Sequence, residues 1–294
     1  MTRRAWTSRL TAAVLLGCVL GGVSECSEQP EPQCITSPVP FAVRLTELER
    51  RESTPGSCDD FGVESFNADP EVGVEPYYAR DDEGQPDYDR GSIAIQTAEV
   101  GELVFSAEAF GVENQATDGT RYSEGAFSAK APDTHGYCAV HTLSATHVVL
   151  PELPAIDDDP DTDEDESFPG QPAVDIRLAW SKFRVYVTAA YYGTQFEAEL
   201  RDTRLTQTGE SCTIVYHAVG LSPAVPCMAL DPETGDPLVD EAGAYVLDPS
   251  ACAPEPDPAN DRPTGSGISP GTRYVCDPAT AYCLLDGSSV PSVR

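Results

Sequence analysis

Residues 174–220, VDIRLAWSKFRVYVTAAYYGTQFEAELRDTRLTQTGESCTIVYHAVG, contain three runs in which apolar and polar residues alternate. Alternation with a period of two, rich in β-branched and aromatic residues, is typical of half-buried β-strands. Turn-forming residues separate the runs, at Tyr192-Gly193-Thr194 and at Thr208-Gly209-Glu210. These turns predict an antiparallel meander of three strands. The alternation changes parity at Ser181-Lys182, which predicts a β-bulge in the first strand.

Other parts of the chain extend this β pattern. Strands are predicted at residues 40–48, 61–66, 92–97, 126–130 and 137–150, whereas residues 102–110 fit either a strand or a short helix. Residues 69–89 combine prolines with acids and predict a loop. Residues 222–270 are rich in proline and glycine, and a closing hairpin follows them. The predicted fold class is therefore all-β: a disulfide-stabilised antiparallel β-sandwich with a long irregular C-terminal coil.

The N-terminus has the pattern of an export signal. A basic segment with Arg3, Arg4 and Arg9 precedes an apolar run over residues 10–23, which is too short to span a bilayer. Within this run, Leu15-Leu16-Gly17-Cys18 resembles the lipobox of bacterial lipoproteins. The resemblance implies cleavage before Cys18 and lipidation of Cys18. Residues 1–17 are then a lipoprotein signal peptide, and residues 18–33 are a tether.

Two alternatives remain for the N-terminus. An ordinary signal peptide would be cut near Ser24, after small residues. Cys26 is a second candidate for the lipid, because its use would leave an even number of cysteines for disulfides. In each case residues 34–294 form a single β-rich extracytoplasmic domain, with an acidic loop at residues 151–173.

The charge of the chain excludes one large class of function. The sequence holds 49 acidic and 18 basic residues, and its formal net charge is −31. Loss of residues 1–17 removes three arginines and no acid, which makes the charge −34. Nucleic-acid binding needs basic patches that displace counterions, so no nucleic acid is expected as a partner. The same charge disfavours electrostatic binding to anionic lipid headgroups.

The acidic run DDDPDTDEDE at residues 157–166 cannot bury itself and predicts a solvated loop. Its alternating aspartates suggest calcium ligands. An EF-hand loop that began at Asp159 would require glycine at Glu164 and glutamate at Gly170, so the match fails.

The remaining cysteines predict disulfides. In an exported chain, well-spread cysteines without a Cys-x-x-Cys motif favour disulfides over a metal site. Pairing of near neighbours predicts the bonds Cys34 with Cys58, Cys138 with Cys212, Cys227 with Cys252, and Cys276 with Cys283. The last pair follows from a short turn at Asp277-Pro278, which would place the two cysteines on facing strands.

Candidate catalytic and metal-binding groups are few. His135, His141 and His147 are six residues apart, so neighbours on one strand would lie about 20 Å apart, too far to share an ion. The sequence holds no Gly-x-Ser-x-Gly, Ser-x-x-Lys or His-Glu-x-x-His motif. We therefore predict no catalytic residue, no metal and no cofactor. Trp180, Tyr186 and Tyr192 share one parity and would suit a sugar-binding platform, but Trp180 also completes an apolar series and is assigned to the core.

Several motifs point to one family. They are the lipobox, residues 180–187, Tyr216-His217-Ala218-Val219-Gly220-Leu221, and Arg262-Pro263-Thr264-Gly265-Ser266-Gly267-Ile268 followed by Cys276 and Cys283. Together they resemble a family of poorly characterised myxobacterial envelope lipoproteins over residues 34–294. The resemblance implies an envelope lipoprotein and brings no catalytic residues.

The expected function follows from the predicted location outside the cytoplasm and from the lack of catalytic motifs. We expect a lipid-anchored extracytoplasmic protein of the cell envelope, at the outer membrane or cell surface, that acts as a surface or scaffold component without catalysis. The lipid would bind it to the membrane, and any protein or glycan partner is unidentified. A carbohydrate- or calcium-dependent ligand-binding module is the main alternative, and a secreted hydrolase is a further one.

Overall fold

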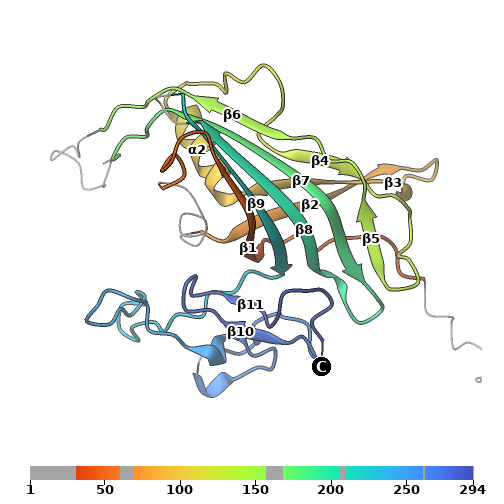
Figure 1. The fold of residues 1–294 in the computed structure, drawn as a ribbon. Coiled ribbons are helices and arrows are strands. Elements are labelled where there is room, and N and C mark those ends of the chain that lie inside the picture. The colour runs from red at the N-terminus through yellow and green to blue at the C-terminus, as the bar shows by residue number, and fades with distance from the viewer. Residues whose placement is uncertain (1–30, 60–68, 157–167, 206–208, 261, 294) are drawn as a thin grey trace, which may run out of the picture. The chain divides into compact units, whose positions relative to one another are not determined.

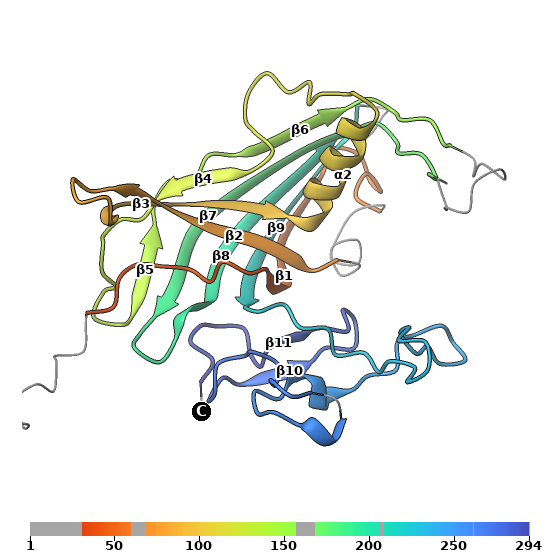
Figure 2. The same cartoon turned by 180° about the vertical axis from the view of Figure 1, so that it is seen from behind.

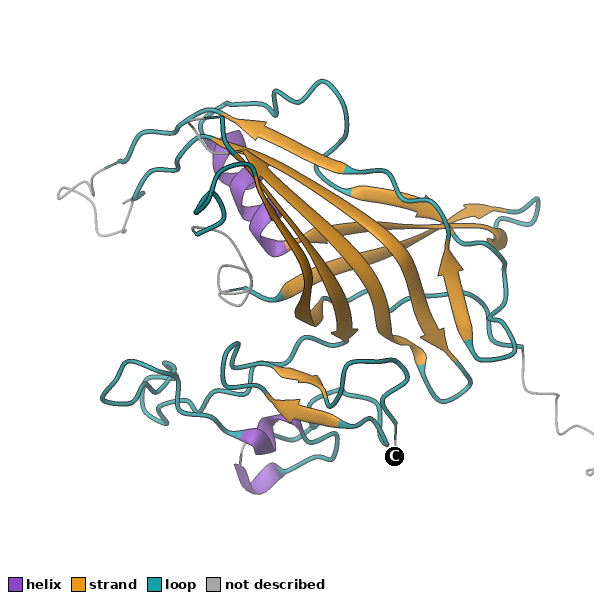
Figure 3. Cartoon of the chain, viewed as in Figure 1, coloured by secondary structure: helices purple, strands orange, loops and turns teal. Residues whose placement is uncertain are grey.

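The main sheet of this computed structural model holds nine of the described strands, and every ladder between them is antiparallel (Figures 1 and 3). The structure describes residues 31–59, 69–156, 168–205, 209–260 and 262–293. Apart from Glu31, these residues belong to one compact unit, Pro32–Arg294, while Met1–Glu31 form the other unit. The predictions for Cys18, Cys26, residues 61–66 and residues 157–166 lie outside the described residues.

The strands of the main sheet are arranged in the order β4-β3-β2-β1-β9-β8-β7-β5, and β6 also pairs with β7. Their bounds are β1 (Phe41–Glu52), β2 (Glu71–Arg80), β3 (Pro86–Thr97), β4 (Ser123–Ala126), β5 (Tyr137–Val140), β6 (Thr146–Leu150), β7 (Val174–Val187), β8 (Tyr192–Leu205) and β9 (Ser211–Leu221). No helix of the described residues is long and apolar enough to cross a bilayer.

The predicted meander is confirmed as β7, β8 and β9. The bulge is also present: Lys182 has φ 52°, and the register between β7 and β8 shifts between Ser181 and Arg184. The first turn lies earlier than predicted, at residues 188–191, where Thr188 and Tyr191 exchange backbone hydrogen bonds. Gly193 belongs to β8 instead, and a Cβ on it would come within 2.5 Å of the Ile35 carbonyl oxygen. Glycine is needed there for a close approach of two chain segments.

The two edges of the curved sheet come close to one another. Phe127, just after β4, forms a bridge with Val140 of β5, and the buried hydroxyls of Ser123 and Thr146 lie 3.1 Å apart. The main core lies inside this nearly closed sheet, where Trp180, Phe183 and Phe196 pack together. The predicted class, an all-β antiparallel protein stabilised by disulfides, is confirmed.

A single α-helix of the described residues, α2 (Ala98–Ala109), follows β3 directly (Figure 2). The Thr97 hydroxyl accepts a hydrogen bond from the Val100 backbone N–H and caps the first turn. Val100, Val104 and Ala107 are buried, so one side of the helix completes the core. The alternative between strand and helix for residues 102–110 is thereby settled in favour of the helix.

The loop predicted for residues 69–89 is wrong, because β2 and the first four residues of β3 occupy most of it. Val72 and Val74 face the core, while the acids point outwards. β1 pairs with β2 only at Glu71 and Val72, so the rest of β2 has a ladder partner on one side and tolerates Pro76. The single strand predicted at residues 137–150 is also divided, into β5 and β6.

All four predicted disulfide pairings are wrong. The structure joins Cys34 to Cys138, Cys58 to Cys212, Cys227 to Cys276, and Cys252 to Cys283. Sequence proximity failed because strand pairing decides which cysteines meet. Glu52 at the end of β1 lies opposite Cys212 of β9, which brings the turn with Cys58 to that cysteine.

The C-terminal segment, from residue 222 onwards, is largely irregular, as predicted, and packs on the end of β9. It contains η1 (Pro249–Cys252), η2 (Pro258–Asn260) and a small hairpin of β10 (Tyr274–Cys276) and β11 (Cys283–Leu285). Cys276 and Cys283 lie opposite one another in this hairpin, but each is bonded to a different partner. Arg44 of β1 donates to the Leu285 carbonyl at 2.8 Å, which fastens the segment to the sheet.

Candidate functional site

A groove lies on the solvent-facing side of β2 and β3, beside α2. Its volume is about 480 Å³, and we call it the β2–α2 groove. Three exposed aromatic side chains line it: Tyr77 from β2, Phe105 from α2 and Tyr122 from the residues before β4. The other lining residues are Gly73, Glu75, Ala94, Gln96, Gly101, Val104, Glu108 and Arg121.

The floor of the groove follows from strand register. Residues directly opposite in antiparallel strands project to the same face, so Gly73 shares a face with Gln96, and Glu75 shares it with Ala94. Their neighbours Val72 and Val74 face the core on the other side. Because glycine and alanine occupy two of these floor positions, the strands leave a hollow where larger side chains would fill it.

One wall of the groove is formed by α2. Gly101, Val104, Phe105 and Glu108 have the spacing i, i+3, i+4, i+7, which places them on one face of a helix. Phe105 is 75% exposed, an unusual position for phenylalanine on a helix that otherwise buries its apolar residues. The ring of Phe105 is therefore accessible to a ligand.

The polar groups of the groove are of two kinds. Arg121 and Gln96 are engaged: Arg121 donates to Glu108 at 2.7 Å, and the Gln96 side-chain amide donates to the Arg121 carbonyl at 2.8 Å. Glu75 has no hydrogen-bond or ionic partner among the described residues. The groove therefore offers aromatic surface and a free carboxylate, and its one guanidinium is already paired.

The arrangement supports binding. Its lining holds two carboxylates and one guanidinium, and the described lining residues contain no serine, cysteine, lysine or histidine beside a base. The groove is not apparent from the sequence, because the prolines and acids of residues 69–89 predict a loop and give no indication of the face on which Glu75 and Tyr77 lie. The exposed Phe105 could have been noticed once residues 98–109 were recognised as a helix.

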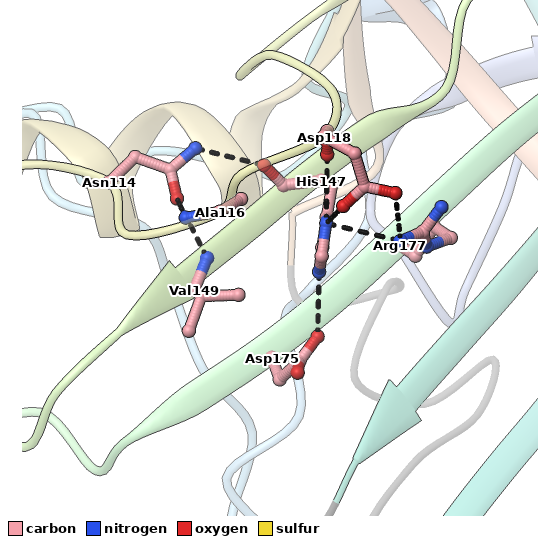
Figure 4. A network of polar contacts seen from close by, with 7 residues as sticks. All are labelled: Asn114, Ala116, Asp118, His147, Val149, Asp175 and Arg177. Atoms are coloured by element: carbon pink, nitrogen blue, oxygen red, sulfur yellow. Dashed lines mark hydrogen bonds and ion pairs between the residues drawn. The ribbon is translucent and has the colours of Figure 1, made fainter.

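A second polar cluster surrounds His147 of β6 (Figure 4). The His147 Nδ1 atom lies 2.8 Å from Asp118, and Nε2 lies 3.0 Å from Asp175 of β7. Arg177 of β7 donates to Asp118 at 2.8 Å. Burial opposes the charge on the imidazole, but the hydrogen bonds that the protonated ring donates to Asp118 and Asp175 outweigh it and raise the pKa of His147. The cluster fastens the segment that carries Asp118 to the outside of the sheet.

We call this cluster the clamp, because its contacts hold neighbouring segments of the chain together. The two carboxylates contact opposite nitrogens of one ring, so they cannot share an ion with it. Asn114 strengthens the clamp, because its side chain donates to the His147 carbonyl and accepts from the Val149 N–H. Neither Asp118 nor Asp175 could be identified from the sequence as a partner of His147.

The other predicted positions lie apart from the groove. Trp180 is 4% exposed and packs in the core, as expected, while Tyr192 is exposed at the start of β8. Cys227, Cys252 and Cys283 form a buried sulfur cluster within 4.8 Å, a geometry that a metal could use if the thiols were free, but all three are in disulfides.

The fold and the groove define the chain as an antiparallel, disulfide-linked β protein with an open aromatic groove in its sheet. The model of the MlpA family matches residues 39–223, which is more than half of the chain, and the chain belongs to this family. The match supports the resemblance to a myxobacterial-type lipoprotein family, and it includes β1–β9 and the groove. Comparisons with curated proteins and with solved structures found no match.

Proposed function

We propose that this chain is a lipid-anchored, extracytoplasmic binding protein of the cell envelope, attached at the outer membrane or cell surface and without catalytic activity. Cys18 carries the lipid, residues 18–33 are the tether, and the β2–α2 groove receives the ligand. The single observation that carries the proposal is the gathering of three exposed aromatic side chains in one hollow. Membership of the MlpA family supports the anchor.

The exposed aromatics support binding because their exposure has a free-energy cost. A large apolar side chain gains roughly 1.5–3 kcal/mol on full burial, and Phe105, Tyr77 and Tyr122 forgo part of it because they remain 75%, 54% and 37% exposed. Solvated apolar patches rimmed by polar groups typically mark interaction sites. The groove is rimmed by Glu75, Glu108 and Arg121, which suits such a site.

The anchor is tested by mass spectrometry of the N-terminal peptide. We expect an acylated peptide that begins at Cys18, and its loss in Cys18→Ala but not in Cys26→Ala. An acylated Cys26, or an unmodified terminus near Ser24, would overturn this part of the proposal. One acyl chain anchors only weakly and several anchor well, so vesicle flotation of Cys18→Ala should show release.

The groove is tested by filling it. In Gly101→Leu the new side chain enters open space, because an added Cβ meets only Gln96, at 3.6 Å. Its matched control is Ala109→Leu, which adds a leucine at the exposed last residue of α2, outside the groove lining. The mature lipoprotein, in a non-ionic polyoxyethylene detergent, would be titrated by calorimetry with oligosaccharides, amines and fatty acids. Any class that binds should lose affinity in Gly101→Leu and keep it in the control.

Two results would refute the binding proposal. The first is that no class of probe binds the wild-type protein saturably. The second is that a probe binds Gly101→Leu as tightly as the wild type, which would place its site elsewhere.

A further inference from the structure

The free carboxylates on the groove face are arranged around one small residue. Ala94 of β3 lies opposite Glu75 of β2 on one side and opposite Glu124 of β4 on the other. Neighbouring strands are about 4.8 Å apart, so the two glutamates start about 10 Å apart with a methyl group between them. Glu75 and Ala94 line the groove, and Glu124 lies just beyond the lining, on the strand next to Ala94. Both glutamates are exposed, and side chains of this length can lean over Ala94 from either side.

Neither Glu75 nor Glu124 has a side-chain partner among the described residues. This contrasts with Glu108, whose charge is neutralised by Arg121. A carboxylate at neutral pH accepts hydrogen bonds and donates none. A ligand held between the two glutamates must therefore supply donors and positive charge.

Aromatic rings flank the same position. Tyr77 of β2 is two residues beyond Glu75 and therefore on the same face, about 7 Å along the strand. Tyr122 lies at the other end: Ser123 pairs with Ile95, and continuing this register places Tyr122 beside Gln96. Cations are attracted to the faces of aromatic rings. The position above Ala94 thus has a free carboxylate on the strand to either side and an aromatic ring toward either end.

We propose that the β2–α2 groove binds an organic cation, a primary ammonium or a guanidinium group, above Ala94 between Glu75 and Glu124. This inference rests on the proposed binding function and names its ligand class. A neutral sugar would leave the charge of both glutamates uncompensated, because the guanidinium of Arg121 is paired with Glu108. Calcium would need six to eight oxygen ligands, and Glu75 and Glu124 are the two free carboxylates beside Ala94. The ammonium can belong to a free polyamine or to a basic side chain of a peptide.

The experiment is calorimetric titration of the mature lipoprotein, in a non-ionic polyoxyethylene detergent, with spermidine, trilysine, triarginine, cellotriose and calcium chloride. We expect the amines or the basic peptides to bind, and spermidine against the peptides distinguishes the two sources. Glu75→Gln and Glu124→Gln should each weaken binding by about three- to tenfold, the range for a partly solvated ion pair with a ring contact. Added NaCl should weaken binding of the wild type.

Two further variants separate a site from a diffuse charge effect. Glu83→Gln removes the same charge from the turn between β2 and β3, outside the groove lining, and should leave affinity within about twofold, as expected for a solvent-screened charge. Ala94→Leu changes no charge but fills the space above the floor, and it should reduce binding at least as much as Glu75→Gln. Melting curves of all variants should match the wild type, because these side chains face solvent.

The outcomes discriminate between the two levels of the proposal. Equal weakening by Glu75→Gln and Glu83→Gln, or undiminished binding in Ala94→Leu, would overturn the cation site. If cellotriose binds and Gly101→Leu abolishes it while no amine binds, the groove is a binding site and the cation is the wrong class. If no probe binds, both the cation site and the proposed function fail.

Discussion

Arg204 of β8 holds the helical wall of the groove to the sheet, and its removal should be strongly destabilising. Its guanidinium donates to both oxygens of Glu99, in the first turn of α2, at 2.6 and 2.7 Å. It also contacts Asp202 at 2.9 Å. The side chains of Arg204 and Asp202 are only 11% and 13% exposed. The buried guanidinium of Arg204 thus forms ion pairs with two carboxylates.

The expected magnitude follows from this burial. Burial raises the pKa of Asp202, although Arg204 opposes the shift by favouring the charged form. In Arg204→Met the carboxylate of Asp202 keeps its burial and loses its partner. Removing one partner of a buried pair costs about 3–5 kcal/mol. For a chain of this size that free energy corresponds to a fall of roughly 10 °C in melting temperature.

The measurement is urea unfolding of Arg204→Met and of the double variant Arg204→Met/Asp202→Asn. The double variant should regain part of the lost free energy of unfolding, because no unpaired charge remains buried. Since the folded pKa of Asp202 is raised, its protonated form favours the folded state at low pH, and this stability is lost as the pH rises. The deficit of Arg204→Met should therefore be smaller at about pH 4.5 than at about pH 7. A loss below about 1 kcal/mol, or no recovery in the double variant, would refute the reasoning.

Three further predictions concern α2, the clamp and the acidic run. Gly101→Ala should stabilise the protein by about 0.5–1 kcal/mol in urea unfolding, because it replaces a helix-interior glycine beside open space. His147→Gln should cost most below about pH 6.5, and the difference from wild type should shrink as the pH rises through the raised pKa of His147, measured by melting at several pH values. Replacing residues 157–166 with a short Gly-Ser segment should leave the melting temperature unchanged or slightly raised. The reason is that bridges between Leu153 and Gln171 and between Ile156 and Phe168 already join the two ends of that segment. A large fall in melting temperature would instead indicate a structural role for the acidic run.

The strands that could be predicted are those whose alternation is undisturbed. Residues 174–187 alternate cleanly until Ser181, and the parity change there located the bulge at Lys182 correctly. β2 was hidden because Pro76 and its acids are typical of loops. They are compatible with this strand because it has a free edge and an exposed face, and neither property is visible before the strand order is known.

The groove and the disulfides depend on which strands become neighbours. Glu75 and Glu124 are 49 positions apart in sequence, yet β3 places them on either side of Ala94. In the same way, the β1–β9 ladder brings Cys58 to Cys212 across 154 residues. Local pattern determines which face of a strand is buried, but register between distant strands determines which side chains meet on the exposed face. A binding site composed of residues on the exposed face of a sheet therefore leaves little trace in the sequence, and its chemistry has to be taken from the structure.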